Sequence, residues 1–175
     1  ADIGIGLGGS SIRNTAEDLL FNKALPLNSY RKSSFTLDGQ SGTSTVMQTA
    51  IGQGETLVSP MHMALITAAV ANNGVLMKPY LIDRIENDSG DLVKRTQSSA
   101  YKRLMSSNEA NLLGKMMRQV VTSGTASALS GKPYTVAGKT GSAEFNEQGD
   151  SHSWFVGYTN VDDPELVIAV IVENG

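Results

Sequence analysis

The sequence predicts an α+β domain in which helices pack on an antiparallel sheet. Two capped, apolar helices precede three consecutive strand candidates at residues 134–145, 153–160 and 165–173. Because strands that follow one another through short turns pair in an antiparallel meander, this end of the chain predicts one small sheet. A length of 175 residues suits one domain with a sizeable core, so we expect a single unit over residues 1–175.

The first third of the chain contains one clear helix signal. Asn14-Thr-Ala-Glu17 has capping-box spacing and predicts a helix in "TAEDLLFNK", which ends before Pro26. Residues 28–50 are rich in serine, threonine and glycine and only weakly patterned. They predict a long loop with some extended segments.

The segment 60–73 predicts a buried central helix. Ser59 can serve as its N-cap, and Pro60 suits the first turn. "MHMALITAAVAN" is apolar almost all round, as expected of a helix covered on every side. Gly74 is the expected C-cap.

The chain between residues 80 and 124 predicts a hairpin and then a second helix. Residues 80–96 alternate and turn at Asp88-Ser-Gly90. Ser106-Ser-Asn-Glu109 is a capping box, and the helix that it opens should end near Gly124. We expect this helix to bury one wide apolar stripe, formed by Leu112, Leu113, Met116, Met117, Val120 and Val121.

Composition and charge exclude several classes of function. The net charge of −3 and the pI near 5.3, without a basic stripe, give no case for nucleic acid. The absence of cysteine excludes thiol catalysis and zinc–thiolate sites and leaves the compartment open. His62 and His152 lie far apart without metal-ligand spacing, and no apolar run is long enough to span a membrane. We therefore expect no metal site and no membrane contact from this segment.

The stretch "VAGKTGSAEF", residues 136–145, has two possible interpretations. A phosphate-binding loop needs a glycine five positions before its final Gly-Lys-Thr, and this chain has Pro133 there. The preceding residues are also β-formers, which excludes a P-loop. Gly4-x-Gly6-x-x-Gly9 has dinucleotide-binding spacing, but no strand candidate precedes it and no βαβ unit follows.

The second interpretation places Lys139-Thr140-Gly141 on a strand beside an acyl-transfer nucleophile. Lys139 would supply positive charge for a substrate carboxylate, and Thr140 a short hydroxyl donor. Gly141 would let an extended substrate pair with the strand, and the N–H of Ser142 would be an oxyanion-hole donor. A solvated strand lysine within a common tripeptide is the alternative at this point.

Four longer segments favour the catalytic interpretation. "AIGQGETLVSPMHMALITAAVANNGVLMKPYLI", "VVTSGTAS", "VAGKTGSAEF" and "HSWFVGY" occur in the order and approximate spacing typical of one family. The sequence resembles the C-terminal part of a penicillin-binding protein transpeptidase domain, with a looser, class B-like match in the first 50 residues. The resemblance implies part of the serine β-lactamase/transpeptidase fold and no cofactor.

In that family, Lys-Thr-Gly is the third active-site motif, after Ser-x-x-Lys and Ser-x-Asn. Ser29-x-x-Lys32 has the right letters but lies in a polar loop, and Ser106-Ser-Asn108 follows the Gly-Gln-Gly element that it should precede. We expect both true motifs upstream of Ala1 and a further helix beyond Gly175. The chain by itself is therefore predicted to be inactive.

The resemblance implies that the parent protein is a peptidoglycan D,D-transpeptidase. Such an enzyme acylates its serine with a D-alanyl-D-alanine stem peptide, and β-lactams stall it as acyl-enzymes. We expect its location to be the extracytoplasmic face of a bacterial membrane, with an anchor outside this chain. A β-lactam-sensing receptor domain of the same fold is the alternative. Uncovered apolar faces predict self-association of the chain when it is isolated.

Four further residues are candidates for the substrate groove. Gly52, Gln53 and Gly54 could shape its wall or form a plain tight turn before Ser59. Trp154 is expected to pack on the sheet, with a groove contact as the alternative. His152 is expected at the surface near a strand start, and His62 as a hydrogen-bonded, partly buried histidine.

Overall fold

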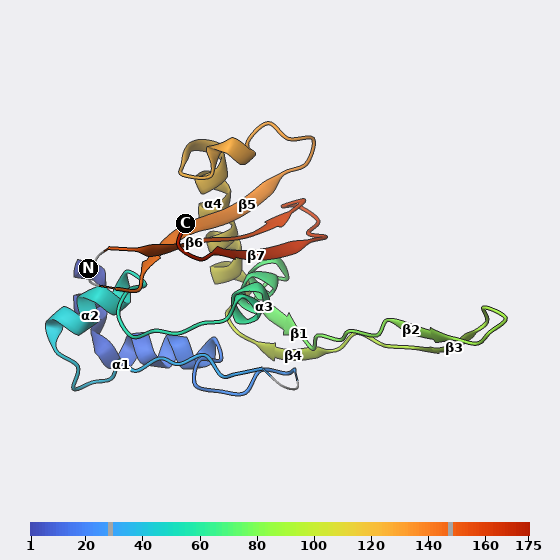
Figure 1. Cartoon of the computed structure of the whole chain (residues 1–175), viewed down its shortest axis with the longest axis horizontal. Helices are drawn as coiled ribbons and strands as arrows, with labels where there is room; N and C mark the ends of the chain where they lie inside the picture. Colours follow the sequence, from blue (N-terminus) through green and yellow to red (C-terminus); the bar gives the residue numbers. More distant parts are fainter. Residues whose placement is uncertain (28–29, 147–148) are drawn as a thin grey trace.

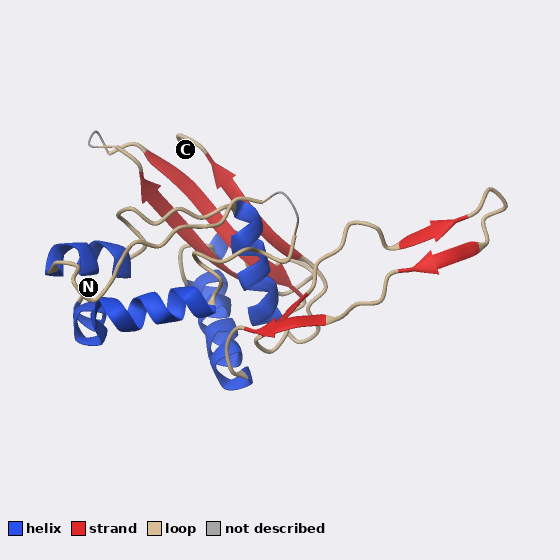
Figure 2. Ribbon diagram, turned by 90° about the horizontal axis from the view of Figure 1, so that it is seen from below, coloured by secondary structure: helices blue, strands red, loops and turns tan. Residues whose placement is uncertain are grey.

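The computed structural model describes residues 1–27, 30–146 and 149–175. Its centre is a three-stranded antiparallel sheet in the order β5-β6-β7, with two helices packed against it and a thin arm that extends to one side (Figures 1 and 2). The strands are β5 (Val136–Glu144), β6 (Ser151–Thr159) and β7 (Val167–Val172). This arrangement confirms the predicted α+β class and the predicted meander.

Phe155 fixes the packing of the sheet on one face. Its ring lies across two glycines of neighbouring strands, because a β-carbon on Gly138 would come within 2.5 Å of the ring and one on Gly157 within 2.9 Å. The ring packs against a buried cluster of Val121, Ala126 and Val136. The two glycines therefore allow an aromatic side chain to lie flat on the strands.

Strand β7 forms the edge of the sheet opposite to β5, and several of its apolar side chains are exposed to solvent. Ile168, Val170 and Val172 alternate along the strand and are 52%, 38% and 53% exposed. Alternate residues of a strand share a face. This face of β7 is therefore an uncovered apolar surface.

Helix α1 (Asp2–Asp18) begins much earlier than predicted. The expected capping box at Asn14 is wrong, because Asn14 lies inside the helix. The helix is kinked at Gly8, whose φ is 75°, and it ends before Leu20, which has a φ of 75° as well. The apolar residues expected at the end of the predicted helix instead form a turn that is buried in the core.

Glycines explain why the start of the chain folds as a helix in spite of its composition. A β-carbon on Gly4 would overlap the side chain of Ala50, and one on Gly9 would overlap the carbonyl group of Asp38. These glycines let α1 approach the segment 37–50 closely. That tertiary contact offsets the low helix propensity of glycine.

Helix α2 (Thr43–Ala50) corrects the prediction of a loop over residues 28–50. It is short, rich in threonine, and buries only Val46, so its sequence carries little periodic signal. The rest of the described segment has no regular secondary structure apart from a turn at residues 39–40 and a single bridge between Ser34 and Leu57, which joins it to the chain ahead of α3.

Helix α3 (Pro60–Ala71) confirms the predicted central helix and its N-cap at Ser59. The hydroxyl of Ser59 accepts a hydrogen bond from the backbone N–H of His62 at 3.2 Å. Every side chain from Met61 to Ala71 is buried or half-buried. The C-cap predicted at Gly74 is wrong, because the helix ends at the C-cap Asn72 and Gly74 follows two residues later with a left-handed φ of 83°.

His62 links three segments in the core and is fully buried, not partly buried as expected. Its Nε2 lies 2.7 Å from the carbonyl oxygen of Leu19, and its Nδ1 lies 2.7 Å from the hydroxyl of Ser33. Because a carbonyl can only accept, Nε2 carries the proton and Nδ1 accepts from the serine. Burial lowers the pKa of His62, so the ring is neutral at pH 7.

The predicted hairpin is confirmed as the projecting arm, strands β2 (Arg84–Glu86) and β3 (Leu92–Arg95). Its turn includes Gly90, with a φ of 84°. Strands β1 (Val75–Met77) and β4 (Ala100–Arg103), which were not predicted, pair at the base of the arm.

Helix α4 (Ser107–Ser123) has the predicted capping box, with both reciprocal bonds between Ser106 and Glu109 present. The predicted apolar stripe is wrong in part, because Leu112, Leu113 and Met116 are exposed. A neighbouring face with small residues is buried instead. Gly114 lies so close to the Tyr158 hydroxyl that a β-carbon would come within 2.7 Å of it.

Candidate active site

The outer edge of β5 carries the residues that the sequence singled out. In an antiparallel strand, the N–H and C=O of one residue point to the same side, and consecutive residues alternate. Three side chains donate to carbonyl groups on the side away from β6: Arg118 to Val136 at 2.8 Å, Lys139 to Thr140 at 2.6 Å, and Gln53 to Ser142 at 3.1 Å. The backbone of Gly138, Thr140 and Ser142 therefore faces outward.

Lys139 and Thr140 place a cation and a hydroxyl at this edge. The Lys139 side chain is exposed, and its ammonium group folds onto the carbonyl of the next residue. The Thr140 hydroxyl lies 2.6 Å from the hydroxyl of Thr125, and either group can donate. Among the residues that the structure describes, no carboxylate forms an ion pair with Lys139.

Thr125 is a site residue that the sequence analysis did not single out. It belongs to the short segment between α4 and the 3₁₀ helix η1 (Ser127–Leu129). The only sequence signal was the Gly-Thr-Ala match within "VVTSGTAS". Its contact with Thr140 could not be derived from spacing along the chain.

Gly141 and Ser142 lie at the next positions along β5, and Trp154 lies beside Gly141 on the central strand β6. Gly141 is paired with Trp154 across β5 and β6, and a β-carbon at Gly141 would make an ordinary 3.5 Å contact with Trp154. Internal packing therefore does not demand a glycine there. Ser142 is exposed, and Trp154 is half-buried on the sheet.

The Gly-Gln-Gly element lies against the far end of the same edge. Gly52 and Gly54 both have positive φ, 84° and 85°, on either side of Gln53. The Gln53 amide donates to the Ser142 carbonyl at 3.1 Å and accepts from the Glu144 N–H at 3.3 Å. Segments 89 residues apart in the chain thus meet at Ser142.

Of the two sequence copies of the upstream motifs, the one that the structure describes in full, at Ser106, does not join this site. Ser106 accepts from the Glu109 N–H and donates to the Glu109 carboxylate, so its hydroxyl serves the cap of α4. Glu109 has a lowered pKa because the Ser106 side chain and backbone donate to its carboxylate. Ser29 lies outside the described residues, and Lys32 is exposed.

The two histidines are also separate from the edge of β5. Both ring nitrogens of His62 form the hydrogen bonds in the core that are described above. His152 is the second residue of β6, where it is half-buried and stacks on Phe145 with ring centroids 4.3 Å apart. The expectation of a position near a strand start is confirmed.

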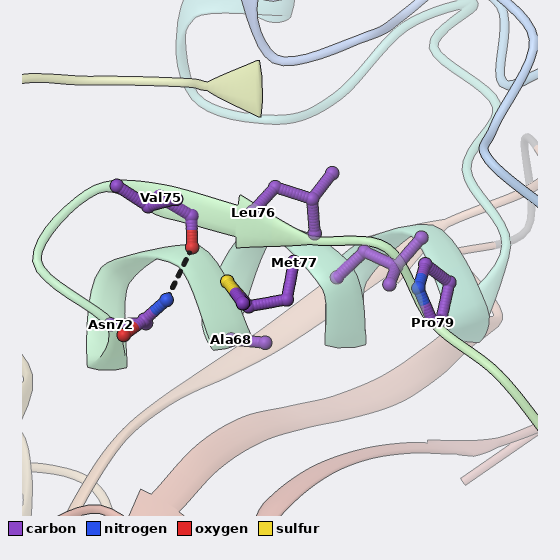
Figure 3. A pocket seen from close by; sticks show the side chains of 7 residues that line it. Ala68, Asn72, Val75, Leu76, Met77 and Pro79 are labelled. Atoms are coloured by element: carbon purple, nitrogen blue, oxygen red, sulfur yellow. Dashed lines mark hydrogen bonds between the residues drawn. The ribbon is translucent and has the colours of Figure 1, made fainter. Parts of the chain in front are cut away.

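An apolar pocket lies elsewhere, between α3 and β1 (Figure 3). The Asn72 amide donates to the Val75 carbonyl at its rim, at 2.9 Å. None of its lining residues belongs to β5. In the described ranges, no group of His, Cys, Asp or Glu is arranged to hold a metal, and no helix has the length and apolarity to cross a membrane.

These contacts define what the edge can do chemically. An extended peptide can pair with the outward backbone of β5, as strands add to an open edge. Lys139 offers a cation for its carboxylate, and the Ser142 N–H can donate to a carbonyl oxygen. The described residues place no serine with an activating lysine beside this edge.

Comparison with known families agrees with the sequence resemblance. Residues 4–175 match the family model described as "Penicillin binding protein transpeptidase domain". The chain is 38% identical over 127 residues to penicillin-binding protein 2a of Streptococcus pneumoniae. It is 32% identical over 151 residues to penicillin-binding protein 3 of Bacillus subtilis.

The chain spans a minor part of those relatives. The matches cover 71% and 82% of this chain but 16% and 21% of the two relatives.

Solved structures show the same fold. The D,D-transpeptidase domain of a peptidoglycan glycosyltransferase from Eggerthella lenta superposes with a TM-score of 0.86 at 29% identity, and the match covers 99% of this chain and 45% of that one. The penicillin-binding protein A of Mycobacterium tuberculosis, solved as an imipenem acyl-enzyme complex, has a TM-score of 0.86 at 24% identity, with 99% and 40% covered.

Proposed function

Because this chain belongs to the family of penicillin-binding protein transpeptidase domains, we propose that it forms the substrate-strand part of a peptidoglycan D,D-transpeptidase. The observation that carries the proposal is the open edge of β5, where Lys139, Thr140 and the outward N–H of Ser142 lie together. A nucleophilic serine and its lysine would come from a part of the longer protein outside this chain.

The proposed reaction has two steps. The serine hydroxyl attacks the carbonyl of the penultimate D-alanine of a stem peptide, the peptide bond breaks, and the terminal D-alanine leaves with the proton. The amine of a neighbouring stem peptide then attacks the ester, and the serine regains its proton. In both steps, the Ser142 N–H stabilises the oxyanion. In the first step, Lys139 holds the carboxylate of the terminal D-alanine, which leaves with that residue. A β-lactam follows the first step and stays as the acyl-enzyme.

The proposal includes a location and an alternative. We place the longer protein at the extracytoplasmic face of a bacterial membrane, held by an anchor outside this chain. A β-lactam-sensing receptor domain would share the same strand. Flanking sequence that encodes a pedestal domain would favour the enzyme, and flanking sequence that encodes several membrane spans with a protease would favour the sensor.

Labelling with a fluorescent penicillin tests whether the active site is divided between this chain and the rest of the longer protein. The isolated chain is expected to stay unlabelled, because Lys139 and Thr140 can position a ligand but not attack it. The longer protein is expected to be labelled in a one-to-one ratio, as followed by gel fluorescence and mass spectrometry. Covalent labelling of the isolated chain at Ser29 or Ser106 would contradict the proposed division.

The isolated chain is also expected to self-associate through β7. Burying apolar surface contributes about 25 cal/mol per Å², and an open strand edge can pair with another copy. Light scattering at rising concentration should show dimers or larger species, and replacing Ile168 and Val172 with lysine should reduce them. A monomer at high concentration that binds no hydrophobic dye would contradict this expectation.

A further inference from the structure

Gln53 contacts β5 in a way that neither a groove wall nor a plain turn requires. Its Nε2 donates to the carbonyl of Ser142, and its Oε1 accepts from the N–H of Glu144. One carboxamide thus supplies one donor and one acceptor to adjacent outward groups of the strand. A peptide unit of a neighbouring strand would supply the same pair.

The backbone around Gln53 fixes the direction of this side chain. Its own N–H donates to the carbonyl of Gln48 at 2.9 Å, which closes the end of α2. The glycines on both sides have left-handed φ values that favour glycine strongly over other residues. A β-carbon at Gly52 would meet no atom within 4 Å, so conformation and not space explains that glycine.

Side chains from other elements occupy both ends of the outer edge of β5, and in the middle the described residues occupy only the Thr140 carbonyl, through the ammonium group of Lys139. At one end, Arg118 donates to the carbonyl of Val136. At the other end, Gln53 donates to the carbonyl of Ser142 and accepts from the N–H of Glu144. Within the described ranges, no side chain bonds to the N–H of Thr140 or of Ser142. An extended ligand can therefore pair with the middle but meets the Gln53 amide beyond the Ser142 N–H.

We propose that Gln53 is a positioning residue that ends the substrate-binding edge at Ser142 and holds the Ser142 N–H toward the reacting carbonyl. This inference rests on the proposed transpeptidase function. Because the carbonyl and N–H of Ser142 point to the same side, a donor that fixes the carbonyl also fixes the orientation of the N–H. A preorganised donor stabilises a developing oxyanion most when it does not have to reorient.

Two substitutions separate the two halves of the contact. Gln53→Ala removes both hydrogen bonds. Gln53→Glu has the same shape and keeps the acceptor for Glu144, but it loses the donor to Ser142. A residue that only fills space would tolerate Gln53→Glu, whereas a positioning residue would not.

Amide hydrogen exchange of the isolated chain tests the contact itself. The Glu144 N–H should exchange about tenfold faster in Gln53→Ala, since a net hydrogen bond of this kind changes an opening equilibrium by roughly that factor. It should stay near the wild-type rate in Gln53→Glu. Unchanged exchange in Gln53→Ala would overturn the inference.

Acylation of the longer protein by a fluorescent penicillin tests the consequence. Both variants should lower the acylation rate constant at saturation about tenfold, while the half-saturating concentration changes less than about twofold. Gln97→Ala, at an exposed position between β3 and β4, is the matched control and should leave both quantities unchanged.

The two possible failures are distinct. A wild-type longer protein that is never acylated would refute the proposed function. The hydrogen-exchange experiment would still test whether Gln53 forms its contact with β5. A wild-type protein that is acylated, with Gln53→Ala and Gln53→Glu at the same rate, would refute the role of Gln53 alone.

Discussion

Replacing Lys139 with methionine is expected to slow acylation of the longer protein by a fluorescent penicillin about a hundredfold or more. Lys139 is exposed at the edge of β5, with its ammonium group 2.6 Å from the Thr140 carbonyl. In the proposed function, this ammonium group binds the carboxylate of an extended ligand that pairs with the strand. Methionine keeps most of the length of the side chain and removes the charge together with the N–H donors. The second-order acylation rate constant measures the effect.

Two companion variants make this experiment specific. Lys94→Met removes an exposed lysine from the arm and should leave acylation unchanged. Lys139→Arg keeps the charge but changes the shape of the donor group, so it should lose less activity than Lys139→Met. Equal rates for Lys139→Met and the wild type would mean that this lysine is merely a solvated strand residue.

Replacing Gly74 with alanine is expected to lower the free energy of unfolding by about 3 kcal/mol or more. Gly74 has a φ of 83°, and a β-carbon there would overlap the backbone carbonyl of Met105. Its own backbone is held on both sides, by Ala69 at 2.7 Å and Leu104 at 2.8 Å. The segment therefore cannot move away from the new methyl group without losing hydrogen bonds. Urea unfolding followed by circular dichroism measures the change.

Gly90 is a matched control for the steric part of this effect. It has a φ of 84°, but a β-carbon there would meet no atom within 4 Å. Gly90→Ala should therefore cost only the left-handed conformation, about 1 kcal/mol. A loss of similar size in both variants would show that the contact with Met105 is not tight in solution.

The elements with local signals could be predicted from the sequence. The caps at Ser59 and Ser106 lie within a few residues of the groups that they bind, so helices α3 and α4 were predicted with bounds close to those observed. The three strands were predicted for the same reason, because alternation and the turn before β7 are local properties.

Elements that depend on distant contacts could not be predicted. Helix α1 depends on the approach of Gly4 and Gly9 to the segment that contains α2, which no local pattern reveals. The orientation of α4 depends on the space between Gly114 and Tyr158, so the most apolar stripe was not the buried one. In the candidate site, Lys139, Thr140 and Ser142 were identified from a motif. The contacts of Thr125 and Gln53 required the structure.

The long reach of Gln53 has a consequence for the order of folding. Strands β5, β6 and β7 follow one another and can pair by closing short loops, which have a low entropic cost. The contact of Gln53 with Ser142 joins residues 89 positions apart, so it contributes most of its stability only after the larger loop has closed. The sheet can therefore exist before its outer edge is complete. In this chain, formation of the sheet and formation of the contact between Gln53 and Ser142 at the edge of β5 are therefore separate folding events.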